Sequence, residues 1–201
     1  MFAKGRNEIQ ASIEDMAQAI KNLAYDINEF YTDKIKTIES KIEEVKKQNV
    51  DLADEEIGVV NYYNCQLLEI FSNSHIEAME TIVSKVYSYA EKHMQMIVEK
   101  VGYNLNKVRR EYSKDGQPIK HISNIEKMFY IIKKHYSLPY SALADVWNEY
   151  SDIHNLRNMI VHKHSYERQL IKIEYIIQNL DQIERMLKGM ECVIRTSKEA
   201  K

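Results

Sequence analysis

The spacing of apolar residues over the first 48 positions constrains this chain more than any other feature. Apolar side chains recur there at alternating steps of four and three, at Ile9, Ile13, Met16, Ile20, Leu23, Ile27 and Phe30. After a shift at Tyr31 the rhythm resumes at Ile35, Ile38, Ile42 and Val45. Heptad spacing is typical of a long helix that packs along one seam. The segment is therefore either one helix of an antiparallel bundle or an arm that dimerises as a coiled coil.

Helical periodicity continues after a break at residues 48–51. A second helix is predicted from the stripe Val60, Tyr63, Leu67 and Phe71. The polar residues 72–74 predict an interruption, and Ser74 with Glu77 has the spacing of a capping box that opens a third helix. This third helix could run to about Arg110, and the sequence leaves open whether the two are continuous across residues 71–75.

The later part of the chain repeats the same pattern. Residues 112–118 predict a loop, Ser123 caps a short helix, and Pro139 opens a helix that reaches His162. Ser165 is the expected cap of the last helix, whose seam is Tyr166, Leu170, Ile173, Ile177, Leu180, Leu187, Met190 and Ile194. No strand pattern competes with these helices.

Composition agrees with a helical fold. Only 5 Gly and 2 Pro among 201 residues leave little room for the tight turns of a β-sandwich, and no phosphate-binding loop motif occurs. We predict an all-α fold, an antiparallel bundle of five to seven helices. Residues 1–50 form its long N-terminal helix and residues 51–201 form the main helical domain.

Charge and cysteine content bound the setting of the protein. The formal net charge of -2 excludes a uniformly basic surface, although a local basic patch remains possible. The two cysteines lie far apart and form no CxxC, which favours a reducing compartment. The polar first residues do not resemble a signal peptide, and no apolar run approaches the roughly 20 residues of a membrane span. We expect a cytoplasmic protein with no membrane contact.

One segment concentrates groups that carry chemistry. Residues 152–164 hold one Arg, three His and two Asn at the junction of two predicted helices. At its centre Arg157 is followed directly by Asn158, and four residues separate Arg157 from His162.

This motif resembles the mark of the HEPN superfamily (higher eukaryote and prokaryote nucleotide-binding domains), in which an Arg, often followed by Asn, precedes a His by four to six residues late in an all-α bundle. The resemblance covers roughly residues 55–195. It implies a metal-independent endoribonuclease without a cofactor, of the kind that acts as a toxin or phage-defence effector with an antitoxin or other regulatory protein. It also implies a homodimer in which Arg157 and His162 of two subunits form one composite site, with Asn158 as a polar positioning residue.

The chemistry of these residue types suits that reaction. Imidazole can take or give a proton near neutral pH, and guanidinium grips two phosphate oxygens while it stays charged. His164 also satisfies the loose spacing, but His162 has the commoner one. HEPN toxins with nucleotidyltransferase antitoxins usually carry a Tyr two residues after the His, where this chain has His164. That difference counts against this subfamily.

RNA binding requires positive charge near such a site. The stretch from Leu105 to His135 contains eight Lys or Arg against three acidic residues. We predict RNA contacts from Arg109, Arg110 and Lys114 in this stretch, and from Lys163 and His164 beside the motif.

Three other interpretations remain. The protein could be a non-catalytic HEPN-like bundle that mediates RNA or protein binding and dimerisation. It could be a coiled-coil interaction module in which the motif occurs by accident. A metal cluster of His154, His162 and His164 lacks a nearby Cys or Glu, and we predict no metal site.

Overall fold

The computed structural model describes residues 8–47, 54–100, 151, 154–160 and 171–199. Within these ranges the chain is helical except at Ile171 and Lys172, and no strand occurs. The helices are α1 (Glu8–Lys47), α2 (Asp54–Lys100), a short helix over 154–160 and α6 (Ile173–Glu199). The predicted all-α class is confirmed.

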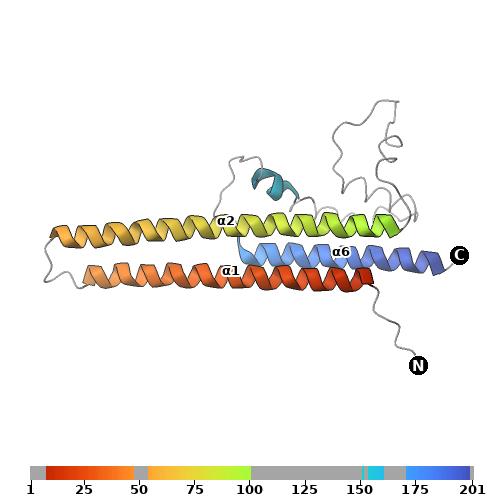
Figure 1. Ribbon diagram of the computed structural model, residues 1–201, viewed down its shortest axis with the longest axis horizontal. Coiled ribbons are helices and arrows are strands. Elements are labelled where there is room, and N and C mark those ends of the chain that lie inside the picture. The colour runs from red at the N-terminus through yellow and green to blue at the C-terminus, as the bar shows by residue number, and fades with distance from the viewer. Residues whose placement is uncertain (1–7, 48–53, 101–150, 152–153, 161–170, 200–201) are drawn as a thin grey trace, which may run out of the picture.

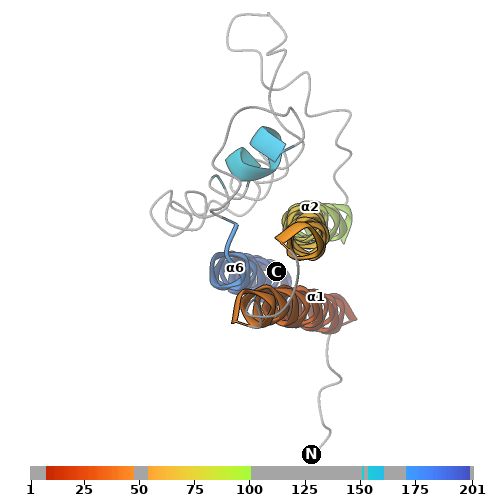
Figure 2. The ribbon, with the colours of Figure 1, turned by 90° about the vertical axis from the view of Figure 1, so that its left-hand side faces the viewer.

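Helices α1 and α2 form a long hairpin, and α6 packs along part of it (Figure 1). The Ser12 hydroxyl lies 3.1 Å from His93 Nε2, and Asn28 Oδ1 lies 3.2 Å from His75 Nε2. Residue numbers rise on α1 while they fall on α2, so the two helices are antiparallel. Seen end-on, the three helices form a triangle (Figure 2).

The core lies between these three helices and is continuous. Helix α1 contributes fully buried Ile13, Ala17 and Ala24, and its other heptad positions Ile9, Met16 and Ile27 pack against the same cluster. Helices α2 and α6 contribute the larger side chains, among them Met79, Ile82, Val86, Met94, Ile97, Ile176, Leu180 and Leu187. The N-terminal half of α1 therefore shares one core with α2 and α6.

Ion pairs join α6 to α1 at the rim of this core. Lys21 Nζ lies 2.6 Å from Asp181 and 3.1 Å from Glu184, while Lys188 Nζ lies 3.0 Å from Glu14 and 2.7 Å from Glu184. Burial raises the pKa of Glu184, but hydrogen bonds from the two lysines outweigh it and leave that pKa lowered. The pairs also show that α6 runs antiparallel to α1.

The structure answers one question that the sequence left open, the continuity across residues 71–75, and it corrects one predicted boundary. Helix α2 continues without interruption through residues 72–74. His75 hydrogen-bonds Asn28 and stacks on Tyr31 at 5.4 Å, so packing on α1 outweighs the weak local capping signal. The last helix begins at Ile173 because Ile171 and Lys172 are not helical, so one helix from Ser165 is excluded.

The predicted seams are confirmed to different degrees. Ile173, Leu180, Leu187 and Met190 of the last helix are buried as expected. By contrast, Val60, Tyr63 and Leu67 of the second predicted stripe are exposed. The predicted loop at 112–118 and the helices predicted from Ser123 and Pro139 to residue 150 lie outside the described residues.

None of the described helices has a stretch both long enough and apolar enough to cross a bilayer.

His93 is a polar group inside this core. Its ring is fully buried, and its Nδ1 lies 2.9 Å from the carbonyl oxygen of Tyr89. Because a carbonyl only accepts, Nδ1 carries the proton and Nε2 accepts from the Ser12 hydroxyl. Burial is the largest cause that lowers the pKa of His93, so the neutral ring is the stable form.

This burial predicts a pH-dependent stability. The unfolded ring binds a proton near its ordinary pKa of 6.5, whereas the folded ring resists protonation. The stability that comes from the neutral ring is therefore fully present above the ordinary pKa of 6.5 and is lost as pH falls below it towards the lowered pKa of the folded ring. His75, whose pKa burial also lowers, acts in the same direction. Urea unfolding between pH 5 and 8 should show this slope, and His93→Gln should reduce it. Equal slopes in both proteins would contradict the assignment.

Core burial predicts the cost of truncation on α6. Leu180→Ala should lower the free energy of unfolding by about 2–5 kcal/mol, because Leu180 is fully buried. The exposed neighbour Gln178 is the matched control, and Gln178→Ala should change it by less than about 0.5 kcal/mol. Urea titration of both variants measures these changes. Similar losses of unfolding free energy in the two variants would contradict the placement of Leu180 in the core.

Candidate functional site

Two of the predicted site residues, Arg157 and Asn158, lie in the helix over 154–160. His162, Lys163, His164, Arg109, Arg110 and Lys114 lie outside the described residues, so their roles stay predictions. The geometry below therefore concerns the Arg–Asn half of the motif.

Packing on the three-helix core holds the short helix in place. Leu156 and Ile160 are partly buried against the core. Their side chains are four residues apart, which places them on one face of the helix. Arg157 and Asn158 are half-buried beside that face. The motif arginine therefore stands at the edge of the packed core.

Tyr87 of α2 forms the floor under the arginine. The guanidinium carbon of Arg157 lies 4.9 Å from the centroid of the Tyr87 ring. A cation above an aromatic face gains about 0.5–2 kcal/mol, depending on how far water is excluded. Tyr87 itself is buried, so the ring gives the charged group a fixed support.

Asn158 connects the arginine to a histidine. Arg157 Nη1 donates to Asn158 Oδ1 at 3.0 Å, and Asn158 Nδ2 donates to His154 Nε2 at 3.0 Å. Because the amide NH₂ only donates, His154 Nε2 is the unprotonated nitrogen in this arrangement. The His154 ring also stacks on Tyr87, with centroids 5.6 Å apart and planes 23° from parallel.

These contacts make a small preorganised site. The side chains of Arg157 and His154 both stack on the Tyr87 ring. The hydrogen bonds of Asn158 fix the arginine and the histidine relative to each other. A guanidinium has five N–H donors, and the hydrogen bond to Asn158 uses one of them. The group can therefore grip phosphate oxygens in a fork without losing its support.

Tyr87 and His154 were not predicted as parts of this site. Nothing in the sequence links Tyr87 to Arg157, because they are 70 positions apart. His154 did carry a signal: it precedes Asn158 by four residues and so shares its helix face. Among the described residues, no group of three His, Cys, Asp or Glu side chains is placed to hold a metal ion.

Comparison with known proteins adds no relative: no family model, no curated protein and no solved structure matches this chain.

Removing the Tyr87 ring should loosen the site. In Tyr87→Leu the side chain still fills apolar space, but Arg157 and His154 lose their stacking partner. We expect faster amide hydrogen exchange over residues 154–160, by up to about tenfold for the loss of one cation–π contact. Tyr25→Leu, at an exposed tyrosine of α1, is the control and should leave this exchange unchanged. Unaltered exchange in Tyr87→Leu would show that the ring does not hold the short helix.

Proposed function

We propose that this protein is a metal-independent endoribonuclease of HEPN type. The observation that supports this most is the fixed placement of Arg157, which stacks on Tyr87 and is hydrogen-bonded by Asn158. Positive charge held in place before the reaction begins is often the largest single contribution to catalysis. We also propose that the complete chain folds as an antiparallel HEPN-like bundle of five to seven helices.

The reaction would be a transesterification within the RNA strand. The ribose 2'-oxygen attacks the adjacent phosphorus while a base takes its proton, and the bond from phosphorus to the 5'-oxygen breaks as that oxygen gains a proton. The products are a 2',3'-cyclic phosphate and a 5'-hydroxyl. His162 would transfer protons, because imidazole titrates near neutral pH. Arg157 would neutralise the charge that builds on the phosphorane, and Asn158 would orient it.

One arginine and one histidine make a sparse site, which is why we propose that two subunits combine. Arg157 and His162 of each subunit would face one RNA strand across a homodimer interface. Arg109, Arg110, Lys114, Lys163 and His164 would hold the flanking phosphates, since salt-dependent contacts from cations dominate RNA affinity. In the cytoplasm such an enzyme would act as a toxin or phage-defence effector, restrained by an antitoxin or other regulatory protein.

A second candidate function is a non-catalytic bundle that binds RNA or protein. The network of Arg157, Asn158 and His154 favours it in one respect, because these groups already satisfy one another. A structural network of this kind needs no substrate. The two functions differ in whether Arg157 contributes to a reaction rate or only to stability.

RNA cleavage in the presence of a chelator separates them. The wild-type protein should cut structured RNA and leave 2',3'-cyclic phosphate ends, which mass spectrometry identifies. Arg157→Ala should lower the rate about 10²–10³-fold, and His162→Ala about 10²–10⁴-fold. Arg185→Ala, at an exposed arginine of α6, is the control and should keep full activity.

Mixing the two inactive variants tests the composite site. A mixed dimer of Arg157→Ala and His162→Ala subunits retains one arginine and one histidine, so part of the activity should return. Cleavage that survives both single changes would remove these residues from the mechanism. An inactive wild-type protein that still binds RNA would favour the non-catalytic function.

A further inference from the structure

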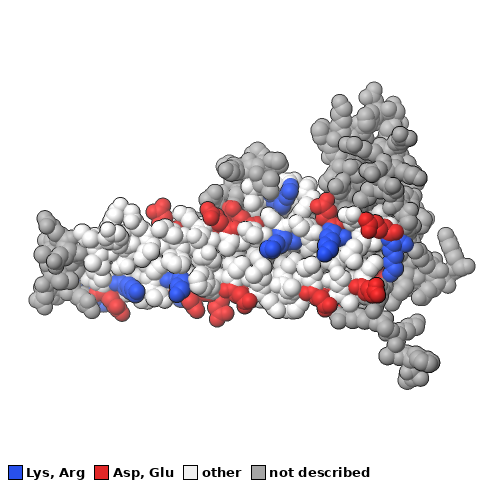
Figure 3. Space-filling model, viewed as in Figure 1, with Lys and Arg blue, Asp and Glu red and all other residues white. Residues whose placement is uncertain are grey.

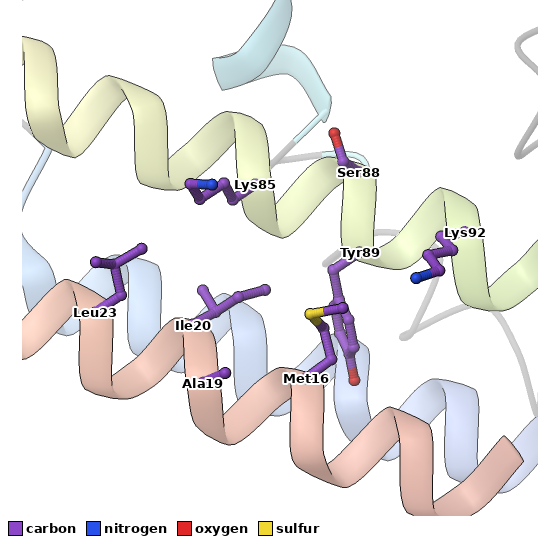
Figure 4. A pocket seen from close by; sticks show the side chains of 8 residues that line it. All are labelled: Met16, Ala19, Ile20, Leu23, Lys85, Ser88, Tyr89 and Lys92. Atoms are coloured by element: carbon purple, nitrogen blue, oxygen red, sulfur yellow. The ribbon is translucent and has the colours of Figure 1, made fainter. Parts of the chain in front are cut away.

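Helices α1 and α2 leave an open apolar groove on the face of the hairpin opposite α6. It has a volume of about 330 Å³. It is lined by Met16, Ala19, Ile20, Leu23, Lys85, Ser88, Tyr89 and Lys92. Figure 4 shows Met16 of α1 and Tyr89 of α2 pointing toward each other's helix, with Lys85 and Lys92 along the α2 edge of the groove. Figure 3 looks onto the same side of the hairpin.

The apolar face extends beyond the groove towards the hairpin tip. Leu67 and Ile70 precede Lys85 and Ser88 by 18 residues, which is five whole turns of helix, so they share the same side of α2. Much of this part of α2 is uncharged in Figure 3. Its exposed apolar side chains, between 43% and 62% accessible, are Val59, Val60, Tyr62, Tyr63, Leu67 and Ile70.

On α1 the same face continues from the groove at heptad spacing. Met16 and Leu23 line the groove, and Phe30 follows seven residues later. Leu23 is 37% exposed and Phe30 is 52% exposed. A continuous strip of large apolar residues on two neighbouring helices typically marks a contact with another helix pair.

The two lysines at the edge of the groove lack acidic partners. Neither Lys85 nor Lys92 forms an ion pair with any residue that the structure describes. On the α6 side of the bundle, by contrast, Lys21, Lys100 and Lys188 each reach a glutamate. The groove therefore suits an occupant that carries acidic groups about two helical turns apart.

The chain itself carries such a helix. Glu8 and Asp15 of α1 are exposed and seven residues apart. They line a hollow that includes Met16 and Ala19, both of which also line the groove. Ser12 contacts His93, and the Tyr89 hydroxyl donates to the Ile13 carbonyl at 3.1 Å, so this turn of α1 lies level with residues 85–92 of α2.

We propose that a second copy of this chain packs on this face. A two-fold axis along the helices places α1 of each copy over α2 of the other at the same level. Glu8 and Asp15 then face the partner's Lys92 and the partner's Lys85, and Met16, Leu23 and Phe30 cover the groove. Because the contact is isologous, each attraction occurs twice.

The size of the face is sufficient for a stable dimer. From Glu8 to Phe30 the hairpin face is about 33 Å long and two helices wide, which gives a footprint of roughly 650 Å² per copy. The total of about 1,300 Å² lies within the range of specific interfaces, and the exposed residues of distal α2 enlarge it.

This contact is separate from the proposed nuclease site. Tyr87, which supports Arg157, is two residues from Lys85, and two residues turn a helix by about 200°. In Figure 2 the helix over 154–160 and α6 lie left of the α1–α2 face. The groove dimer thus leaves the Arg157 side of both copies free, and a composite nuclease site would require a second contact.

Light scattering and sedimentation of the full chain test the proposal. The wild type should form at least a dimer, and Lys85→Glu with Lys92→Glu should raise the dissociation constant about tenfold or more, because it replaces attraction by repulsion at both charge pairs in each half of the interface. Glu8→Lys with Asp15→Lys should do the same. Combining all four changes should restore association, since the charges are then exchanged.

A charge-matched control uses exposed cations elsewhere. Lys172→Glu with Arg185→Glu should leave association unchanged. Circular dichroism confirms that each variant is folded, and Arg157→Ala should dimerise like the wild type. A wild type that stays monomeric, or a dimer unaffected by both charge reversals, would overturn the proposal. A monomeric wild type would also contradict the composite nuclease site, whereas a dimer unaffected by the charge reversals would overturn the groove contact alone and leave the nuclease assay to be judged by itself.

Discussion

Burial of apolar side chains between α1, α2 and α6 is the interaction on which the other features of this protein depend. One continuous cluster contains Ile13 and Ile20 of α1, Ile82 and Val86 of α2, and Leu180 of α6. Each fully buried side chain of this size contributes about 1.5–3 kcal/mol. The same cluster supports Leu156 and Ile160, so the short helix that carries Arg157 takes its position from the core.

Polar groups inside this core decide how the helices align. A purely apolar seam would allow α1 to slide along α2, since heptads repeat. His93 prevents this sliding, because its ring bonds both Tyr89 of its own helix and Ser12 of α1. Towards the tip of the hairpin, a buried polar atom lacks a hydrogen bond. Asn61 Oδ1 of α2 is buried and has no hydrogen-bond partner among the described residues. Stability should therefore concentrate at the α6 end.

Apolar spacing in the sequence was sufficient to predict the helices, but less so their ends. Long periodic stretches such as residues 9–45 give a strong signal, and α1 spans nearly the same residues. Ser74 and Glu77 have the spacing of a cap, yet a cap contributes only about 1 kcal/mol, and the contacts of His75 with Asn28 and Tyr31 override it. Periodicity also does not say which face of a helix finds a partner. It identified the stripe of Tyr63 and Leu67, which the chain leaves exposed.

In the candidate site, too, the sequence reveals residues that are close along the chain but not those that only the fold brings together. Arg157 and Asn158 are adjacent, so a motif reveals them, whereas Tyr87 comes close to them only through the packing of α2. This arrangement makes α2 the element that connects the two proposals. Lys85 and Tyr87 project to opposite sides of one rigid helix, so charge on the groove side and the guanidinium on the other side stay at a fixed separation. A second copy bound in the groove would add two helices alongside α1 and α2 without touching Arg157. The effect of dimerisation on the site would then come through the stiffness of α2, and not through a direct contact.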